Sequence, residues 1–149
     1  EMCIRDSQGT RCRQLAEYVV FESPLNMLCD SPTNYDREEE CTEFIATIPT
    51  VWEQTIAMNG EIGKYITMAR RKGDVWYVGS LTNWDARTLT LDLSFLGAGR
   101  WKAEMFHDGV NANRLASDYQ KTVTDIPASR KLTVKMAQGG GCALKIYKE

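Results

Sequence analysis

The sequence lacks the features that mark several classes of protein. It has one histidine and no Cys-x-x-Cys pair, which argues against a structural zinc site. It has 18 Lys and Arg against 20 Asp and Glu, a net charge of −2, which argues against nucleic-acid binding. No run approaches the roughly 20 apolar residues of a membrane-spanning helix. We therefore expect no metal site in this chain, no nucleic-acid partner and no membrane partner.

What is present is ordinary globular composition. The 149 residues are 43% hydrophobic and 26% charged. A chain of this size can bury roughly two-thirds of its unfolded surface, so a core is expected. The five cysteines leave at least one unpaired, and we expect mostly buried, reduced thiols.

The pattern of apolar residues changes at Pro49. Before it, apolar residues recur at helical spacing, which predicts a helix over 10–21 and a second helix from Asn34 or Asp36 to Ile48. Between them, the short apolar run 25–29 is typical of a strand covered on both faces. One such strand between two helices has no sheet to join, so this segment resembles the end of a larger α/β domain.

After Pro49 the apolar residues alternate at period two between turn signals. Strands are predicted over 51–58, 65–71, 75–81, 88–93, 101–107, 121–126, 131–136 and 142–147. Asn59-Gly60 predicts a tight turn after the first of them. Seven or eight short strands in this arrangement indicate an antiparallel β-sandwich.

A series of short blocks resembles glycoside hydrolase family 97. The blocks are GTRCRQLA (9–16), YVVFESPL (18–25), DSPTNY (30–35), FI (44–45), IPTVWE (48–53), GKY (63–65), ARR (69–71), WYVG (76–79), TNWDAR (82–87) and FLG (95–97). The resemblance covers nearly everything from Gly9 to the end of the chain. Family members are bacterial α-glucosidases and α-galactosidases with an N-terminal β-sandwich, a central (β/α)8 barrel, a C-terminal β-sandwich and a calcium ion at the active site.

The resemblance implies a division of the chain. Residues 1–8 are predicted to be a non-native leader, residues 9–48 the last helix-strand-helix of the barrel, and residues 49–149 the C-terminal sandwich. The fold is then mainly β, an antiparallel sandwich preceded by a barrel remnant. The catalytic carboxylates and calcium ligands of the family lie upstream, so we assign no catalytic or metal-binding residue here. The resemblance also implies a periplasmic location.

Two residues after the predicted strand 25–29 are candidates for substrate binding. In a (β/α)8 barrel the active site lies at the carboxyl ends of the strands. Asp30 and Asn34 follow the last strand and could line a sugar subsite of the intact enzyme. Alternatively, Asp30 only orders the Ser31-Pro32 turn. A third hypothesis makes Asp30 and Asp36 the carboxyl pair of a complete enzyme, whereas an acid such as Asp36 near a helix start more simply complements the helix dipole.

Two further residue types suggest sites that the sequence does not favour. His107 ends a predicted strand, which favours a surface histidine at a turn over a general base. Trp52, Trp76 and Trp101 lie within or beside strand patterns and are predicted to be core residues. Trp84 lies in a turn-like segment and is the best candidate for an exposed platform that stacks on a sugar, although a ring packed on the sandwich edge is favoured.

Together these observations predict the C-terminal part of an α-glycosidase that hydrolyses α-linked glucosides or galactosides. The sandwich is expected to be a structural accessory of the catalytic barrel, and the fragment is expected to be inactive by itself. Its partners would be the remainder of the barrel and, in the parent, an α-linked oligosaccharide, with calcium as the parent's cofactor. The alternative is a carbohydrate-binding β-sandwich module.

Overall fold

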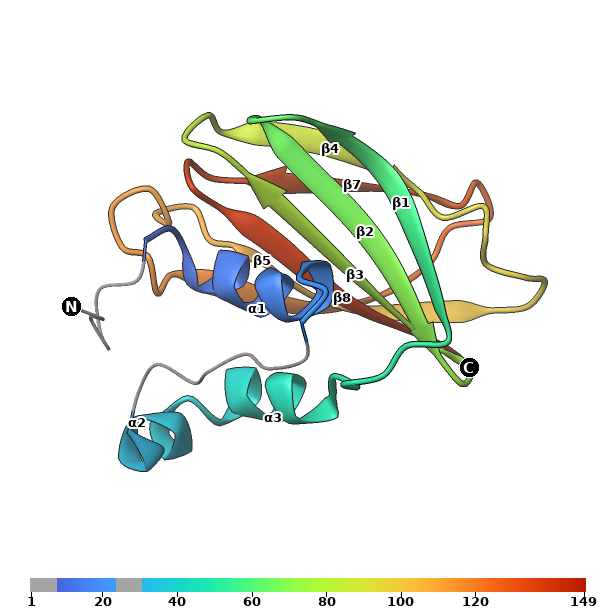
Figure 1. The fold of residues 1–149 in the computed structure, drawn as a ribbon, viewed down its shortest axis with the longest axis horizontal. Coiled ribbons are helices and arrows are strands. Elements are labelled where there is room, and N and C mark those ends of the chain that lie inside the picture. Colours follow the sequence, from blue (N-terminus) through green and yellow to red (C-terminus); the bar gives the residue numbers. More distant parts are fainter. Residues whose placement is uncertain (1–7, 24–30) are drawn as a thin grey trace.

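The structure, a computed structural model, describes residues 8–23 and 31–149. Within these residues three helices precede eight strands (Figure 1). The helices are α1 (Arg11–Val20), α2 (Pro32–Arg37) and α3 (Glu39–Thr47). The strands are β1 (Gln54–Glu61), β2 (Tyr65–Lys72), β3 (Val75–Thr82), β4 (Arg87–Asp92), β5 (Trp101–Asp108), β6 (Tyr119–Asp125), β7 (Lys131–Met136) and β8 (Gly141–Lys148). The strand predicted over 25–29 lies outside the described residues.

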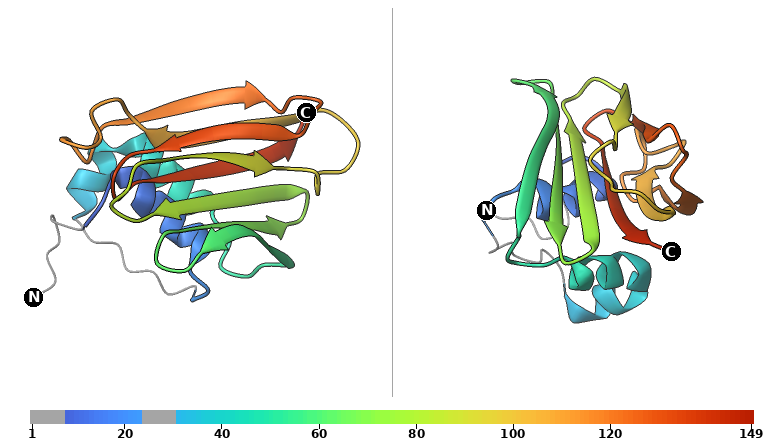
Figure 2. Two further views of the ribbon diagram at one scale, coloured as in Figure 1. Left: turned by 90° about the horizontal axis from the view of Figure 1, so that it is seen from above. Right: turned by 90° about the vertical axis from the view of Figure 1, so that its right-hand side faces the viewer.

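The strands form two stacked antiparallel sheets. Six strands pair in the order β1-β2-β3-β8-β5-β6, and β4 pairs with β7 in a smaller sheet. Figure 2 shows the smaller sheet on one face of the larger sheet and α1 on the opposite face. The loops after β1, β3, β5 and β7 all meet at one end of the sandwich, beside the start of α1, and we call this the loop end (Figure 1). The predicted sandwich is confirmed.

One hydrophobic core fills the space between the two sheets. Leu91 and Leu93 from the β4 side meet Val78, Leu144 and Ile146 of the larger sheet, and all five are fully buried. The inward alternation predicted for 88–93 and 131–136 is confirmed, because the apolar side chains of both segments enter this core. Each fully buried aliphatic side chain contributes about 1.5–3 kcal/mol to folding.

A second core joins α1 to the outer face of the larger sheet. The predicted helix is confirmed to within one residue at each end, with Thr10 as its N-cap. Its buried stripe includes Leu15 and Ala16, which pack with Phe106 and Ala143 of the sheet. The helix approaches β3 closely at Gly79, where an added Cβ would lie 2.8 Å from the carbonyl oxygen of Ala16. Because they share a core, α1 and the sandwich form one packed unit.

The second predicted helix is interrupted. Glu38 has φ −112° and ψ 46°, so α2 and α3 are separate elements where one helix was expected. The predicted apolar stripe is nevertheless confirmed, because Cys41 and Phe44 are buried and Ile45 and Ile48 pack beside them. The Phe44 ring lies 4.8 Å from the Phe106 ring, centroid to centroid, which fixes α3 against β5.

The predicted turn at Asn59-Gly60 is wrong. Asn59 and Gly60 pair with Thr67 and Ile66, so β1 runs on to Glu61. A register shift after Ala57 accommodates the change in pairing. The turn comes later, at Gly63, whose φ of +76° suits a residue without a Cβ.

Candidate functional site

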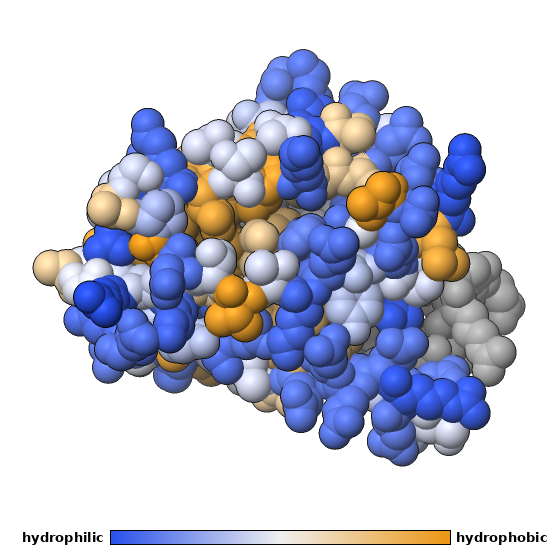
Figure 3. Space-filling view, turned by 180° about the vertical axis from the view of Figure 1, so that it is seen from behind, coloured by the Kyte–Doolittle hydropathy of each residue, from blue (hydrophilic) through white to orange (hydrophobic). Residues whose placement is uncertain are grey.

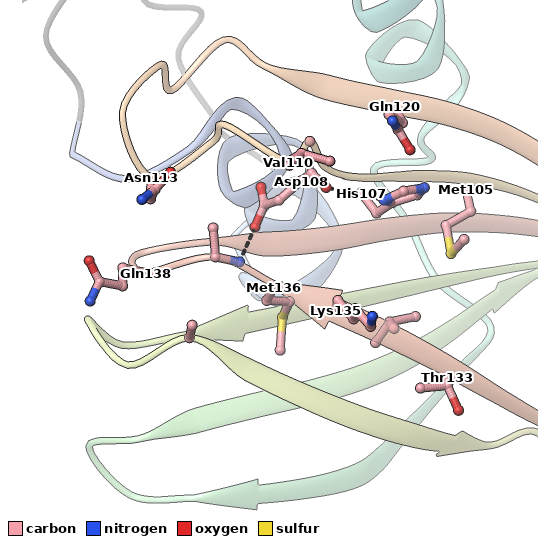
Figure 4. A pocket seen from close by; sticks show the side chains of 14 residues that line it. Met105, His107, Asp108, Val110, Asn113, Gln120, Thr133, Lys135, Met136 and Gln138 are labelled. Atoms are coloured by element: carbon pink, nitrogen blue, oxygen red, sulfur yellow. Dashed lines mark hydrogen bonds between the residues drawn. The ribbon is translucent and has the colours of Figure 1, made fainter.

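A groove runs between the free edge of β7 and the β5–β6 part of the larger sheet. Because β7 pairs only with β4, its other edge has no strand partner among the described residues. The groove has a volume of about 790 Å³. Figure 3 shows the face of the molecule opposite α1, where the surface is hollowed and hydrophobic residues are exposed in the hollow. The lining residues, most of them drawn in Figure 4, are Ala86, Met105, His107, Asp108, Gly109, Val110, Asn113, Gln120, Thr133, Val134, Lys135, Met136, Ala137 and Gln138.

Asp108 is the one carboxylate in the lining of the groove, and its oxygens are already occupied. It accepts hydrogen bonds from the Thr10 hydroxyl at 2.5 Å, from the amide of Ala137 at 2.8 Å and from the amide of Gly141 at 3.2 Å. Figure 4 shows the bond to Ala137. Burial raises the pKa of the Asp108 carboxyl, and these three hydrogen bonds oppose that rise. The carboxylate thus fastens the start of α1 to the β7–β8 hairpin.

Among the described residues, the ring nitrogens of His107 contact a carbonyl oxygen and a hydroxyl rather than a carboxylate. Its Nδ1 lies 3.2 Å from the carbonyl oxygen of Asp108, and its Nε2 lies 3.4 Å from the Thr122 hydroxyl. The side chain is half-buried next to the end of β5. The Asp108 carbonyl can orient the ring, but a neutral carbonyl oxygen takes up less of the charge of a protonated base than a carboxylate would. The interpretation of His107 as a histidine at a turn rather than a general base stays a prediction.

The burial of the four tryptophans differs in part from the prediction. Trp76 and Trp101 are core residues as predicted, whereas Trp52 is half-buried and contacts Tyr77 edge-on. Trp84 is 63% exposed, so the favoured expectation of a packed ring is wrong. One part of its ring contacts Gly139, where an added Cβ would lie 2.6 Å from it, and the rest faces solvent. Trp84 is not among the residues that line the groove.

Arg70 is a buried cation that the sequence analysis did not single out. It lies on β2, is 4% exposed, and donates from Nη2 to the carbonyl oxygen of Val20 at 3.1 Å, at the end of α1. Its guanidinium carbon lies 5.8 Å from the centre of the Trp52 ring. Burial lowers the pKa of Arg70, and nearby Glu22 partly offsets this. The sequence did contain a signal for this burial. Arg70 lies at the same alternating positions as Ile66 and Met68, which places it on the same face of the strand.

The predicted substrate-binding residues stay a prediction. Asp30 lies outside the described residues. Asn34 lies in α2, is half-buried, and its carbonyl oxygen accepts from the amide of Glu38 at 3.2 Å. Asp36 is exposed on the same helix. Asp108 was missed as an organising residue because its partners are distant in sequence and no local pattern indicates them.

The described residues offer no metal cluster. Over 8–23 and 31–149, no group of three or more His, Cys, Asp and Glu side chains could hold an ion. Cys12, Cys41 and Cys142 are free and buried, and burial raises the pKa of each thiol. Such thiols are poor nucleophiles and poor metal ligands. No helix in the described part of the chain is long and apolar enough to cross a membrane.

Comparison with protein families gives a match over most of the sandwich. Residues 51–147 match the family described as "Glycosyl-hydrolase 97 C-terminal, oligomerisation". A retaining alpha-galactosidase of Bacteroides thetaiotaomicron is 60% identical over 140 residues, which are 94% of this chain and 21% of that protein. A probable retaining alpha-galactosidase of Streptomyces bingchenggensis is 28% identical over 70% of this chain and 16% of its own length. The chain therefore spans about a fifth of the first of these relatives and about a sixth of the second.

Solved structures show the same arrangement of helices and sheets. A glycoside hydrolase family 97 enzyme from Pseudoalteromonas sp., in complex with acarbose, matches with a TM-score of 0.88 and 39% identity, over 94% of this chain and 23% of that one. A beta-arabinopyranosidase matches with a TM-score of 0.78 and 26% identity, over 93% of this chain and 21% of its own. These matches cover more of the chain than the sandwich does, so the superposed part includes the helical segment as well.

Proposed function

Because the chain belongs to the family of C-terminal domains of glycosyl hydrolase 97, we propose that it is the accessory domain of an enzyme that cleaves α-linked galactosides or glucosides. The observation that carries this proposal is the 60% identity to about a fifth of a retaining alpha-galactosidase. The domain would stiffen the catalytic part of the parent, with which its helical segment would be continuous.

The chemistry of the groove supports a non-catalytic role. Glycoside hydrolysis uses two carboxyl groups, about 5–5.5 Å apart for retention or about 6.5–9.5 Å for inversion. The groove has one carboxylate, Asp108, and three hydrogen bonds from the protein engage it. We therefore propose that the catalytic pair belongs to the remainder of the parent. The described residues contain no cluster of side chains that fits a calcium ion. We propose that the calcium of the parent also lies in the remainder of that protein, and that the parent is periplasmic.

Hydrolysis by the chain alone tests the proposal. The purified chain should release no chromophore from a chromogenic α-galactoside or α-glucoside, while the 60% identical alpha-galactosidase serves as the positive control. Turnover by the chain that disappears in Asp36→Asn or Asp30→Asn would overturn it in favour of a complete enzyme.

Carbohydrate binding is a second candidate, and the exposure of Trp84 favours it. A flat, solvent-facing ring can stack on the apolar face of a sugar. A sugar site also needs polar groups that converge on the ligand, and the groove that has such groups is not lined by Trp84. Titration of the chain with α-linked gluco- and galacto-oligosaccharides, followed by tryptophan fluorescence, should show no saturable change. A saturable change that Trp84→Ala removes would establish binding.

A further inference from the structure

The groove between β7 and the β5–β6 part of the larger sheet has polar side chains along both walls. Asn113 and Gln120 lie on the β5–β6 side, and Thr133, Lys135 and Gln138 lie on the β7 side (Figure 4). All five side chains are exposed. Within the part of the chain that the structure describes, none of these five side chains makes a hydrogen bond or an ion pair. Their polar groups are therefore available to a ligand.

The floor between these walls is apolar. Met105, Val134 and Met136 line the groove, and the last two are buried in the core between the sheets. The smaller sheet has two strands against six in the larger sheet, which leaves room for the groove beside β7. Its volume of about 790 Å³ lies in the range of pockets that hold small ligands. An apolar lining with a few polar groups that orient the ligand is the usual composition of such pockets.

The two walls are fixed relative to each other. Asp108, the last residue of β5, accepts from the amide of Ala137 just after β7 at 2.8 Å. In the β5–β6 loop, the amide of Asn111 donates to the carboxylate of Asp118 at 2.8 Å, and this bond closes the loop that carries Asn113. A site that is already ordered pays little conformational entropy when a ligand binds.

The polar groups of the groove match a neutral ligand that carries hydroxyl groups. Among the lining residues that the structure describes, Lys135 is the one lysine or arginine and Asp108 is the one carboxylate. Phosphates and carboxylates are typically bound by arginine forks or by several cations, which this lining does not offer. Each carboxamide of Asn113, Gln120 and Gln138 can both donate and accept, as a sugar hydroxyl does.

A peptide strand is the other kind of ligand that this groove suggests, because β7 has a free edge. Lys131 and Lys135 lie on β7, and lysines on an edge strand discourage pairing with another strand. Strand pairing would also use the backbone of β7 and give no role to the carboxamides of Asn113 and Gln120. The side chains of the groove therefore favour a sugar over a strand.

We propose that this groove binds an α-linked oligosaccharide, with sugar hydroxyls on Asn113, Gln120 and Lys135 and the carbon-bound hydrogens of a ring on Met105. The choice of an α-linked sugar rests on the proposed function, since the parent would cleave such chains. The domain would then hold substrate as well as stiffen the catalytic part. This site is separate from Trp84, which does not line the groove. Because the described lining contains no tryptophan, binding here leaves tryptophan fluorescence unchanged.

Titration of the full chain with an α-linked glucotriose or galactotriose tests the site, followed by calorimetry and by side-chain amide signals in NMR spectra. The wild type should bind at least one trisaccharide with a dissociation constant of about 1 mM or below. The carboxamide signals of Asn113 and Gln120 should shift on binding. Asn113→Ala and Gln120→Ala should each raise the dissociation constant roughly fivefold, because each removes hydrogen bonds to the ligand.

Asn59→Ala is the matched control for these two variants. Asn59 is also an exposed carboxamide, but it lies on β1, at the opposite edge of the larger sheet from β6. This variant should bind the trisaccharide as the wild type does. All three variants should melt at the temperature of the wild type, because the side chains are exposed.

Four results would overturn this inference. They are no saturable binding of either trisaccharide up to about 20 mM, binding that Asn113→Ala and Gln120→Ala leave unchanged, equal weakening by Asn59→Ala, and binding lost only in Trp84→Ala. A chain that binds neither sugar, but whose β7 backbone amides become protected by an extended peptide of alternating valine and glutamate, would assign the groove to a strand. Each result leaves the accessory role standing, since the hydrolysis assay judges that role separately.

Discussion

Asp108 connects three segments that lie far apart in the sequence. Its carboxylate receives hydrogen bonds from Thr10, 98 residues earlier, and from Ala137 and Gly141, 29 and 33 residues later. The sequence could place Asp108 at a strand end, but periodicity reports only which face a residue shares with its neighbours. It cannot indicate the donors that reach that face from distant segments.

Removing the Asp108 carboxylate should destabilise the chain in a graded way. Asp108→Ala leaves buried donors without partners and should cost about 2 kcal/mol or more of the free energy of unfolding. Asp108→Asn should cost less, because its amide can still accept from the two backbone amides and donate to the Thr10 hydroxyl. Urea unfolding at pH 7 measures both, with Asp74→Asn in the exposed β2–β3 turn as a neutral control. Equal losses in all three variants would contradict this role.

The raised pKa of Asp108 predicts a dependence of stability on pH. Burial makes the folded state bind this proton more tightly than the unfolded state, whose carboxyl titrates near 3.8. The part of its contribution that depends on protonation is therefore complete below that value and is lost as the pH rises through the folded pKa, while the hydrogen bonds that the carboxylate accepts remain. The difference between the free energies of unfolding of the wild type and of Asp108→Asn should decrease as the pH rises from about 3 to about 7, the range in which carboxyl groups in proteins titrate. A difference that rises would contradict the direction of the shift.

At the scale of elements, the sequence predicted the positions of α1 and the strands, since apolar spacing follows their periods. It did not predict what α1 packs against. The resemblance assigned the helix to a barrel, and that assignment stays a prediction. In the structure the apolar stripe of α1 is buried against β3 and β8 of the sandwich. The predicted turn at Asn59-Gly60 is wrong for a related reason, because a contact with another segment overrides the local pattern. The pairing of β1 with β2 continues past that dipeptide.

Gly79 is the position at which the contact between helix and sheet can be tested. Gly79→Ala would place a Cβ 2.8 Å from the carbonyl oxygen of Ala16 and 2.9 Å from a methyl of Val20, which forces α1 away from β3. Overpacking of this kind costs about 1–3 kcal/mol. Gly97→Ala is the control, because an added Cβ there meets nothing within 4 Å. Equal melting temperatures for the two variants would show that α1 does not pack closely on the sheet.

At the scale of the whole molecule, the helical segment and the sandwich behave as one unit. They share a buried core, and solved family 97 enzymes superpose on 94% of the chain. Division of the chain at residue 48 into a barrel remnant and a sandwich stays a prediction, although the family match begins at residue 51. The buried polar contacts of Asp108 and Arg70 serve this unit, since each ties one end of α1 to the sandwich.

The accessory role is tested most directly by transplanting the chain. In the 60% identical alpha-galactosidase, the 140 corresponding residues can be replaced by this chain, with and without Gly79→Ala. We expect both chimeras to keep kcat within about twofold of the parent, because no reacting group is altered. The Gly79→Ala chimera should melt at a lower temperature. A folded chimera whose kcat falls sharply with Gly79→Ala, at an unchanged melting temperature, would contradict a purely structural role.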